Sequence, residues 1–226
     1  MDIVFGLWAD GGASPDHGGD EAGAVGAPVV GPNGLLDILE MPYGLSAPPS
    51  ALVVRIAAWQ AALEAADDRQ RFWSRSLEVD AWSTARALLT WRDQLVSAGW
   101  SPEPAWSGKR LIDLAAAEKA ASGLPDGLAD RLVRIGAALD NGITRTVRRL
   151  RLIDARALHA SEWNRLFDRL EKLGVTIEEI GVAPSAPAET ALGRLQRWIV
   201  NGGVLSGARD GSVTLATSAS TTLGAE

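Results

Sequence analysis

The sequence has no cysteine among its 226 residues. This absence excludes disulfide bonds, thiol catalysis and cysteine-held zinc or iron–sulfur sites within the chain. There are two histidines, His17 and His159. They are too few for a histidine-rich metal site and leave little for a Ser-His-Asp hydrolase. The composition therefore excludes enzymes that depend on cysteine and disfavours enzymes that depend on several histidines.

Lysine is also scarce, which bears on phosphate binding. The three lysines are Lys109, Lys119 and Lys172. None is near residues 5–12 or 30–36, the glycine-containing junctions that follow the first two apolar segments. A P-loop needs Gly-Lys-Ser/Thr, because the lysine neutralises the nucleotide phosphates and the hydroxyl binds magnesium. Asp10 would repel a triphosphate, and Pro32 lacks a backbone donor. We therefore expect no cofactor in this chain.

The remaining composition is that of an ordinary globular protein. Hydrophobic residues make up 46% and charged residues 22%, and the length suits one large domain or a domain with an insertion. The net charge of −6 requires any nucleic-acid contact to be local. We find no secretory signal and no run of about 20 apolar residues. These features predict a cytoplasmic protein without a membrane partner.

Short apolar segments alternate with helical patterns at both ends of the sequence. The predicted strands are residues 3–8, 27–31, 150–154, 175–177 and 212–215. The predicted helices between and after them include residues 35–39, 161–170 and 192–199. Strands that alternate with helices imply right-handed crossovers and a mainly parallel sheet. The expected fold class is therefore α/β.

Residues 49–145 have a different pattern. Apolar residues recur three and four apart, which predicts four helices around residues 52–63, 82–96, 111–115 and 128–139. Asp80 is the expected N-cap of the second helix, and Gly99 its expected end. We predict that residues 1–48 form the first part of an α/β core, that 49–145 are a helical insertion, and that 146–226 complete the core. No closing element follows the last strand, so we expect a truncated chain.

Nine tryptophans against one tyrosine and three phenylalanines are unusual. Trp59, Trp82, Trp163 and Trp198 fall on apolar helical faces, and we expect most of the tryptophans to lie in the core. In the segment Trp91-Arg92-Asp93, we expect an arginine held by an acid to lock helix packing.

Arginines are concentrated at the exit of the helical insertion. Five lie within twelve residues: Arg145, Arg148, Arg149, Arg151 and Arg156. Their forked guanidinium groups suit phosphates, although an exposed strand edge paired with acids would look the same. Arg75, two residues after Trp73, is a further candidate for binding a single strand, although core packing is the favoured interpretation of the indole.

The predicted DNA-binding residues are Arg145, Arg148, Arg149, Arg151 and Arg75. Asp154 ends a predicted strand, where a metal-binding aspartate would be placed, but it lacks an acidic neighbour. Glu118-Lys119 and Glu171-Lys172 are adjacent pairs without the spacer of a Glu-x-Lys nuclease motif. We therefore predict no catalytic residue and no metal ligand.

Several groups of residues, in their order and spacing, carry a resemblance to a known family. They are Gly-Pro-x-Gly-Leu-Leu-Asp-x-Leu-Glu at 31–40, Phe-x-x-Arg-Ser-x-x-x-Asp at 72–80, Leu-Leu-x-Trp-Arg-Asp-x-Leu at 88–95, and Ala-Gly-Trp at 98–100. Together they resemble the amino-terminal part of bacterial PD-(D/E)XK nuclease-family proteins of the AddB-like helicase–nuclease type. Residues 150–154 and 163–175 continue the resemblance.

The resemblance implies an inactivated, helicase-like region with a RecA-like core, a helical insertion and a nuclease domain far downstream. It implies a non-catalytic part of a DNA double-strand-break repair protein that scaffolds a helicase-type partner and contacts DNA. The family's nuclease motif has no counterpart before Glu226. Two alternatives stay open: a protein-interaction module without DNA binding, and an α/β enzyme with a small ligand.

Overall fold

The structure is a computed structural model. It describes residues 1–10, 27–48, 50–103, 108–141, 146–180, 186–201 and 204–214. The described residues up to Glu179 form one compact unit, and those from Ile180 on belong to a second. The predicted helical insertion therefore lies in the same unit as the sheet.

Four parallel strands form the sheet of the first unit. They are β1 (Asp2–Phe5), β2 (Val29–Val30), β3 (Arg149–Leu152) and β4 (Thr176–Glu179), in the order β2-β1-β3-β4. Ile3 pairs with Leu150, and Leu150 pairs with Ile177. The predicted α/β class and the parallel sheet are thus confirmed.

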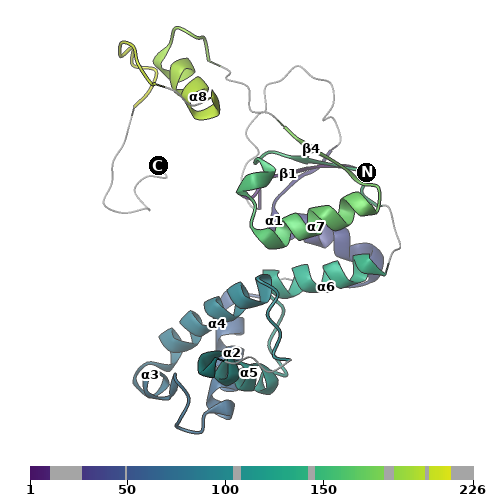
Figure 1. The fold of residues 1–226 in the computed structure, drawn as a ribbon, viewed down its shortest axis with the longest axis vertical. Coiled ribbons are helices and arrows are strands. Elements are labelled where there is room, and N and C mark those ends of the chain that lie inside the picture. Colours follow the sequence, from purple (N-terminus) through teal and green to yellow (C-terminus); the bar gives the residue numbers. More distant parts are fainter. Residues whose placement is uncertain are drawn as a thin grey trace. The chain divides into compact units, whose positions relative to one another are not determined.

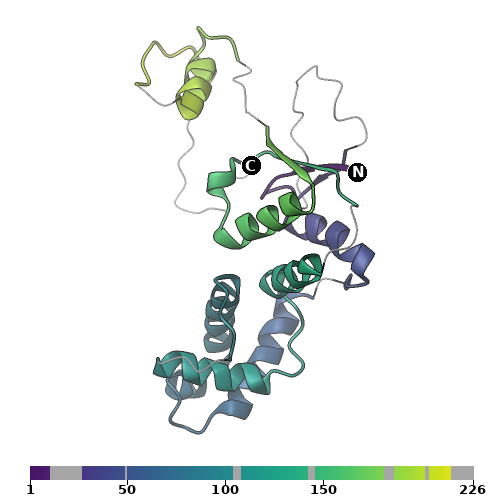
Figure 2. The same ribbon diagram turned by 45° about the vertical axis from the view of Figure 1, so that its right-hand side comes forward.

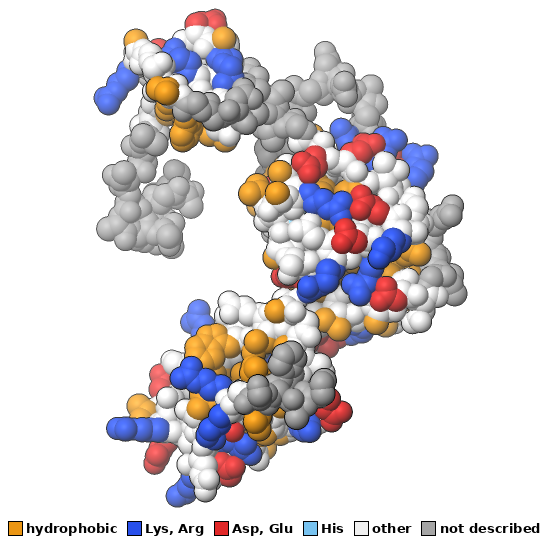
Figure 3. All heavy atoms as spheres, in the orientation of Figure 1, with side chains coloured by type: hydrophobic (Ala, Val, Ile, Leu, Met, Phe, Trp, Pro, Cys, Tyr) orange, Lys and Arg blue, Asp and Glu red, His pale blue; other side chains and the backbone are white. Residues whose placement is uncertain are grey.

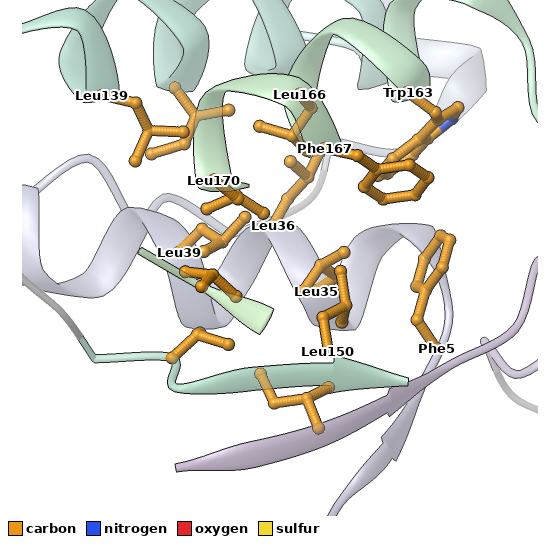
Figure 4. Close-up of a cluster of buried hydrophobic side chains, with 14 of the residues drawn as sticks. Phe5, Leu35, Leu36, Leu39, Leu139, Leu150, Trp163, Leu166, Phe167 and Leu170 are labelled. Carbon is orange, nitrogen blue, oxygen red and sulfur yellow. The ribbon is translucent and has the colours of Figure 1, made fainter. Parts of the chain in front are cut away.

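Two of the described helices, α1 (Pro32–Glu40) and α7 (Ser161–Lys172), cover one face of this sheet. A third, α6 (Leu128–Asp140), packs against α1 and α7 on their side away from the sheet, as both ribbon views show (Figures 1 and 2). Phe5 and Leu150 point from the strands toward Leu35 and Phe167 on these helices (Figure 4). All four side chains are fully buried. Burying side chains of this size contributes roughly 1.5–3 kcal/mol each, so this cluster holds the layers together.

The described secondary structure of the insertion between β2 and β3 consists of helices joined by loops. After the short 3-10 turn Met41–Tyr43 follow α2 (Leu52–Ala66), α3 (Ser74–Val79), α4 (Ala81–Ser97) and α5 (Lys109–Ala120). They have their own apolar cluster, in which Trp59, Trp73 and Leu89 are fully buried. The four predicted helices are present, with α6 as the fourth. Sequence periodicity missed α3.

Two predicted helix ends are confirmed by their hydrogen bonds. Asp80 caps α4, because its Oδ1 accepts the N–H of Ser83 at 3.0 Å. Gly99 follows α4 with a φ of +94°, a conformation that costs glycine little. The Trp100 N–H then donates to the Leu95 carbonyl at 2.8 Å. This bond pattern ends the helix as a Schellman motif does.

The second unit has one described helix, α8 (Ala191–Asn201). The prediction of a strand at residues 212–215 is wrong for 212–214, while residue 215 lies outside the described residues. Ser212 accepts the Leu192 N–H through its hydroxyl, and its own N–H and hydroxyl donate to Asp210. The two bonds from Ser212, together with one from the Ala191 N–H, lower the pKa of Asp210 to about 2. The segment caps α8 rather than pairing in a sheet.

The tryptophans divide between the core and the surface. Trp59 and Trp163 are buried as expected, whereas Trp82 and Trp198 are 42% and 43% exposed. Trp82 lies in the first turn of α4, and α8 belongs to a unit whose described helix has no second helix beside it. An apolar helical face predicts burial only where another element covers it.

Candidate functional site

Three of the predicted DNA-binding arginines lie together at β3. Leu150 and Leu152 point into the core, so Arg149 and Arg151 point to the opposite face of the sheet, because side chains alternate along a strand. Arg148 directly precedes the strand. Within the described part of the first unit, α1, α6 and α7 all lie on the other face.

Nearby carboxylates partly neutralise these arginines. Arg148 donates to both oxygens of Asp2, at 3.1 and 3.2 Å, which lowers the pKa of Asp2 and raises that of Arg148. Arg149 lies 3.7 Å from Glu178. Arg151 has no carboxylate within 4.0 Å among the described side chains. Arg148 and the strand together therefore present one unpaired and two paired guanidinium groups.

The other two predicted arginines do not join this group. Arg75 is exposed on α3, in the helical insertion. Arg145 lies outside the described residues. Trp73 is 1% exposed and belongs to the core of the insertion, so core packing, the favoured interpretation of this indole, is confirmed, and stacking on a nucleic-acid base does not fit the structure.

The amino terminus of α1 is occupied by a carboxylate of the chain itself. Asp10 accepts the backbone N–H groups of Asn33 at 2.6 Å and of Gly34 at 3.1 Å, and the Asn33 side-chain amide at 2.9 Å. Gly31 permits this approach, because a Cβ there would lie 2.3 Å from the Asp10 nitrogen. Backbone N–H groups at a helix amino terminus bind phosphates in many α/β proteins. Here those groups already have an anionic partner.

Asp154, which ends a predicted strand where a metal-binding aspartate would be placed, has a structural role. One of its carboxylate oxygens accepts the Leu7 N–H at 2.9 Å, which joins the ends of β1 and β3. Its carbonyl oxygen lies 3.2 Å from Nε2 of His159, a buried residue that stacks on Phe5. Among the described residues, no three His, Asp or Glu side chains are grouped closely enough to hold a metal ion.

A buried ion-pair network holds the insertion together. Arg92, 6% exposed, contacts Glu118 on α5 at 2.6 Å and Asp130 on α6 at 2.5 Å, besides its neighbour Asp93 at 3.1 Å. Burial would lower the pKa of Arg92, but its bond to Glu118 and the charge of Asp130 hold that pKa above its usual range. The expectation that Arg92 locks helix packing is confirmed. The adjacent Trp91 is 47% exposed.

The structure also gathers cations that sequence reasoning missed around the loop from Asp67 to Phe72. Lys109 donates to the Gln70 carbonyl at 3.3 Å, and Arg110 lies over the Phe72 ring, 5.8 Å from its centroid. Arg69 in this loop has a φ of +64°. Among the described residues, it is the only residue other than glycine with a positive φ. The left-handed conformation costs an ordinary L-residue roughly 1–2 kcal/mol.

None of the helices in the described ranges is both long and apolar enough to cross a membrane. Comparisons of the chain with protein families, with curated proteins and with solved structures found no match.

Proposed function

We propose that this chain is the non-catalytic, helicase-like amino-terminal portion of an AddB-like protein of DNA double-strand-break repair. It would scaffold a helicase-type partner in the cytoplasm and contact DNA. The observation that carries the proposal is the Asp10 carboxylate at the amino terminus of α1. A RecA-like arrangement of the parallel sheet is part of the same proposal.

The position of Asp10 supports a region that does not use nucleotide. An incoming phosphate would have to displace this carboxylate and would then meet no lysine, because the three lysines are elsewhere in the sequence. Pro32 also removes one of the N–H groups that the first turn of α1 would otherwise offer. Asp10 therefore gives a physical reason to expect that the chain keeps a RecA-like arrangement but does not hydrolyse ATP.

The arginines at β3 support the DNA contact. Arg149 and Arg151 share one face of the sheet, and Arg148 stands at its start. Guanidinium groups in such a row match a phosphate backbone, which they contact without reading the base sequence. Arg151 has no carboxylate partner among the described residues that a phosphate would have to displace. The exposed ion pairs of Arg148 and Arg149 are weak enough for a phosphate to replace the carboxylate.

The experiment is a fluorescence-anisotropy titration of labelled single- and double-stranded DNA at several salt concentrations. The test variant carries Arg149→Gln and Arg151→Gln together. Each lost phosphate contact lowers the slope of log K against log salt by roughly 0.7–0.9. We expect the double variant to bind DNA more weakly. Its slope should be smaller by the amount that corresponds to the loss of about two phosphate contacts.

A matched control removes two cations elsewhere. Lys172→Gln at the end of α7 and Arg209→Gln in the second unit change the net charge by the same amount, and both side chains are exposed. The control should bind DNA as the unchanged chain does. Equal losses in the two double variants, or no salt-sensitive binding by the unchanged chain, would contradict the assigned DNA contact.

One observation favours the alternative of a protein-interaction module. The pairs Arg148–Asp2 and Arg149–Glu178 already neutralise two of the three cations at β3. A module of this kind would retain a helicase-type partner and show no salt-sensitive DNA binding. The same titration separates the two functions.

A further inference from the structure

Side-chain hydrogen bonds hold the backbone of the loop from Asp67 to Phe72, between α2 and α3. Asp67 Oδ1 accepts the Arg69 N–H at 3.1 Å and the Ser74 hydroxyl at 2.5 Å. Asp68 Oδ1 accepts the Gln70 N–H at 2.9 Å. Two successive aspartates thus form turns that hold Arg69 between them in its left-handed conformation.

The buried Asp113 of α5 ties the same loop to the body of the insertion. Its carboxylate accepts the Phe72 N–H at 3.2 Å and contacts Arg71 at 3.0 Å and Lys109 at 3.3 Å. Burial would raise the pKa of Asp113, but the bonds from Arg71 and Phe72 keep it below the usual value. The loop is therefore anchored at both of its ends.

This anchoring leaves a group of cations on the surface. We call Arg69, Arg75, Lys109 and Arg110 the insertion-tip surface, and all four are exposed. Lys and Arg side chains are prominent at the end of the helical part that carries α3 (Figure 3). Within the described residues, Arg69, Arg75 and Arg110 have no carboxylate within 4.0 Å. The acids of the loop are engaged in its turns and with Arg71.

The conformation of Arg69 gives the second argument. Glycine or asparagine would be the expected residue at a φ of +64°, because an arginine gains nothing from this backbone and is strained by it. Strained backbone conformations that surrounding bonds maintain are found preferentially at functional sites, such as active sites and ligand-binding sites. The Arg69 side chain makes no bond to the rest of the described chain that would explain its presence.

We propose that the insertion-tip surface binds the phosphate backbone of DNA, as a second contact besides the arginines of β3. The inference rests on the proposed function, since it deepens the DNA contact assigned there. Phosphate is favoured over bases, because Arg110 already covers the Phe72 ring and Trp73 is buried. Unpaired guanidinium groups on a fixed scaffold bind phosphates independently of sequence.

The decisive variant is Arg69→Gly, which removes the cation and also relieves the backbone. A residue needed only for folding would lower the urea midpoint when replaced. Here we expect the midpoint to stay equal or rise, while DNA affinity and the salt slope both fall. Arg69→Lys, which keeps the charge, should bind DNA nearly as the unchanged chain does.

The titration includes Arg69→Gly, the triple variant Arg69→Gln, Arg75→Gln and Arg110→Gln, and the β3 double variant. A slope of log K against log salt that is reduced in the triple variant by the amount for about three lost phosphate contacts supports the proposal. An unchanged slope there, with a reduced slope in the β3 variant, overturns it and leaves the proposed function standing. A reduced slope in the triple variant with an unchanged β3 variant keeps this surface and overturns the β3 contact.

A competition arm separates nucleic acid from acidic protein. Unlabelled DNA should displace the labelled DNA far more efficiently than polyglutamate at equal charge concentration. Equal displacement would overturn the assignment of this surface to DNA in favour of an acidic polypeptide. Absence of DNA binding in the unchanged chain would overturn this inference together with the DNA contact of the proposed function.

Discussion

Asp10 is a single residue that caps the amino terminus of α1 from outside the helix. Its carboxylate accepts two backbone N–H groups of α1 from a position 23 residues before Asn33. A side chain that caps a helix from its own N-cap position is common, but here the N-cap residue is Gly31, which has no side-chain acceptor. The distant aspartate takes over this role.

Asp10→Ala should therefore destabilise the protein. Loss of a side-chain cap costs typically about 1 kcal/mol, and the negative charge at the helix amino terminus adds to the effect. Urea unfolding followed by circular dichroism measures the change in the free energy of unfolding. Glu78→Ala, at an exposed acid of α3, is the control and should leave that free energy unchanged. Equal stabilities of the Asp10 variant and the unchanged chain would show that the cap contributes nothing.

At the residue scale the sequence predicted local roles better than distant ones. Asp80 as a helix cap and Arg92 as a packing residue could be inferred from their neighbours in the chain. The bond from Asp10 to α1 could not, although the sequence did show that Asp10 disfavours phosphate. The strained conformation of Arg69 depends on two aspartates and a distant Asp113, and a pattern of Asp-Asp-Arg shows only that a turn is favoured.

The helix α6 joins the insertion to the sheet. Its first turn contributes Asp130 to the ion pairs of Arg92, while its next residue, Arg131, is 5% exposed and contacts Glu40 of α1 at 2.9 Å. Further along, Leu132 and Ile135 pack in the core of the sheet. One helix thus belongs to both clusters, which explains why the insertion and the sheet form one compact unit.

Glu40→Gln should be among the most destabilising single substitutions. Glu40 is fully buried and contacts both Arg131 and Arg134, so the variant leaves buried positive charge without its main partner. Breaking a buried pair in this way costs roughly 3–5 kcal/mol.

The control for Glu40 removes another acid from the same arginine. Asp37 contacts Arg131 at 2.6 Å, but its side chain is 56% exposed, and an exposed pair contributes about 0–1 kcal/mol. Asp37→Asn should therefore cost at least 2 kcal/mol less than Glu40→Gln in the same urea experiment. Similar losses in the two variants would mean that burial does not decide the strength of these pairs.

At the element scale, periodicity predicted the long helices and the short parallel strands. It missed α3, whose six residues are too few to show a repeat. It also assigned a strand to residues 212–215, because Val213 lies among β-favouring residues, although the Asp210 turn uses Ser212 as a cap for α8. Short segments depend on such contacts more than on their own pattern.

For the whole molecule, alternating elements correctly indicated a parallel sheet with a helical segment between its strands. The sequence did not show that the residues from Ile180 on belong to a second compact unit, apart from the unit that contains the sheet. The arginines of β3 illustrate the same limit: their density in the sequence was visible, but their pairing with Asp2 and Glu178 depends on strand order. Net charge likewise gave no indication of a local basic surface on an acidic chain.

The most direct measurement is the affinity of the chain for labelled DNA across a range of salt concentrations, with magnesium alone and with magnesium plus ATP. We expect log K to fall linearly with log salt, and ATP to leave this line unchanged, because Asp10 already accepts the N–H groups at the amino terminus of α1. A line shifted by ATP, or no salt-sensitive binding in either series, would contradict this expectation.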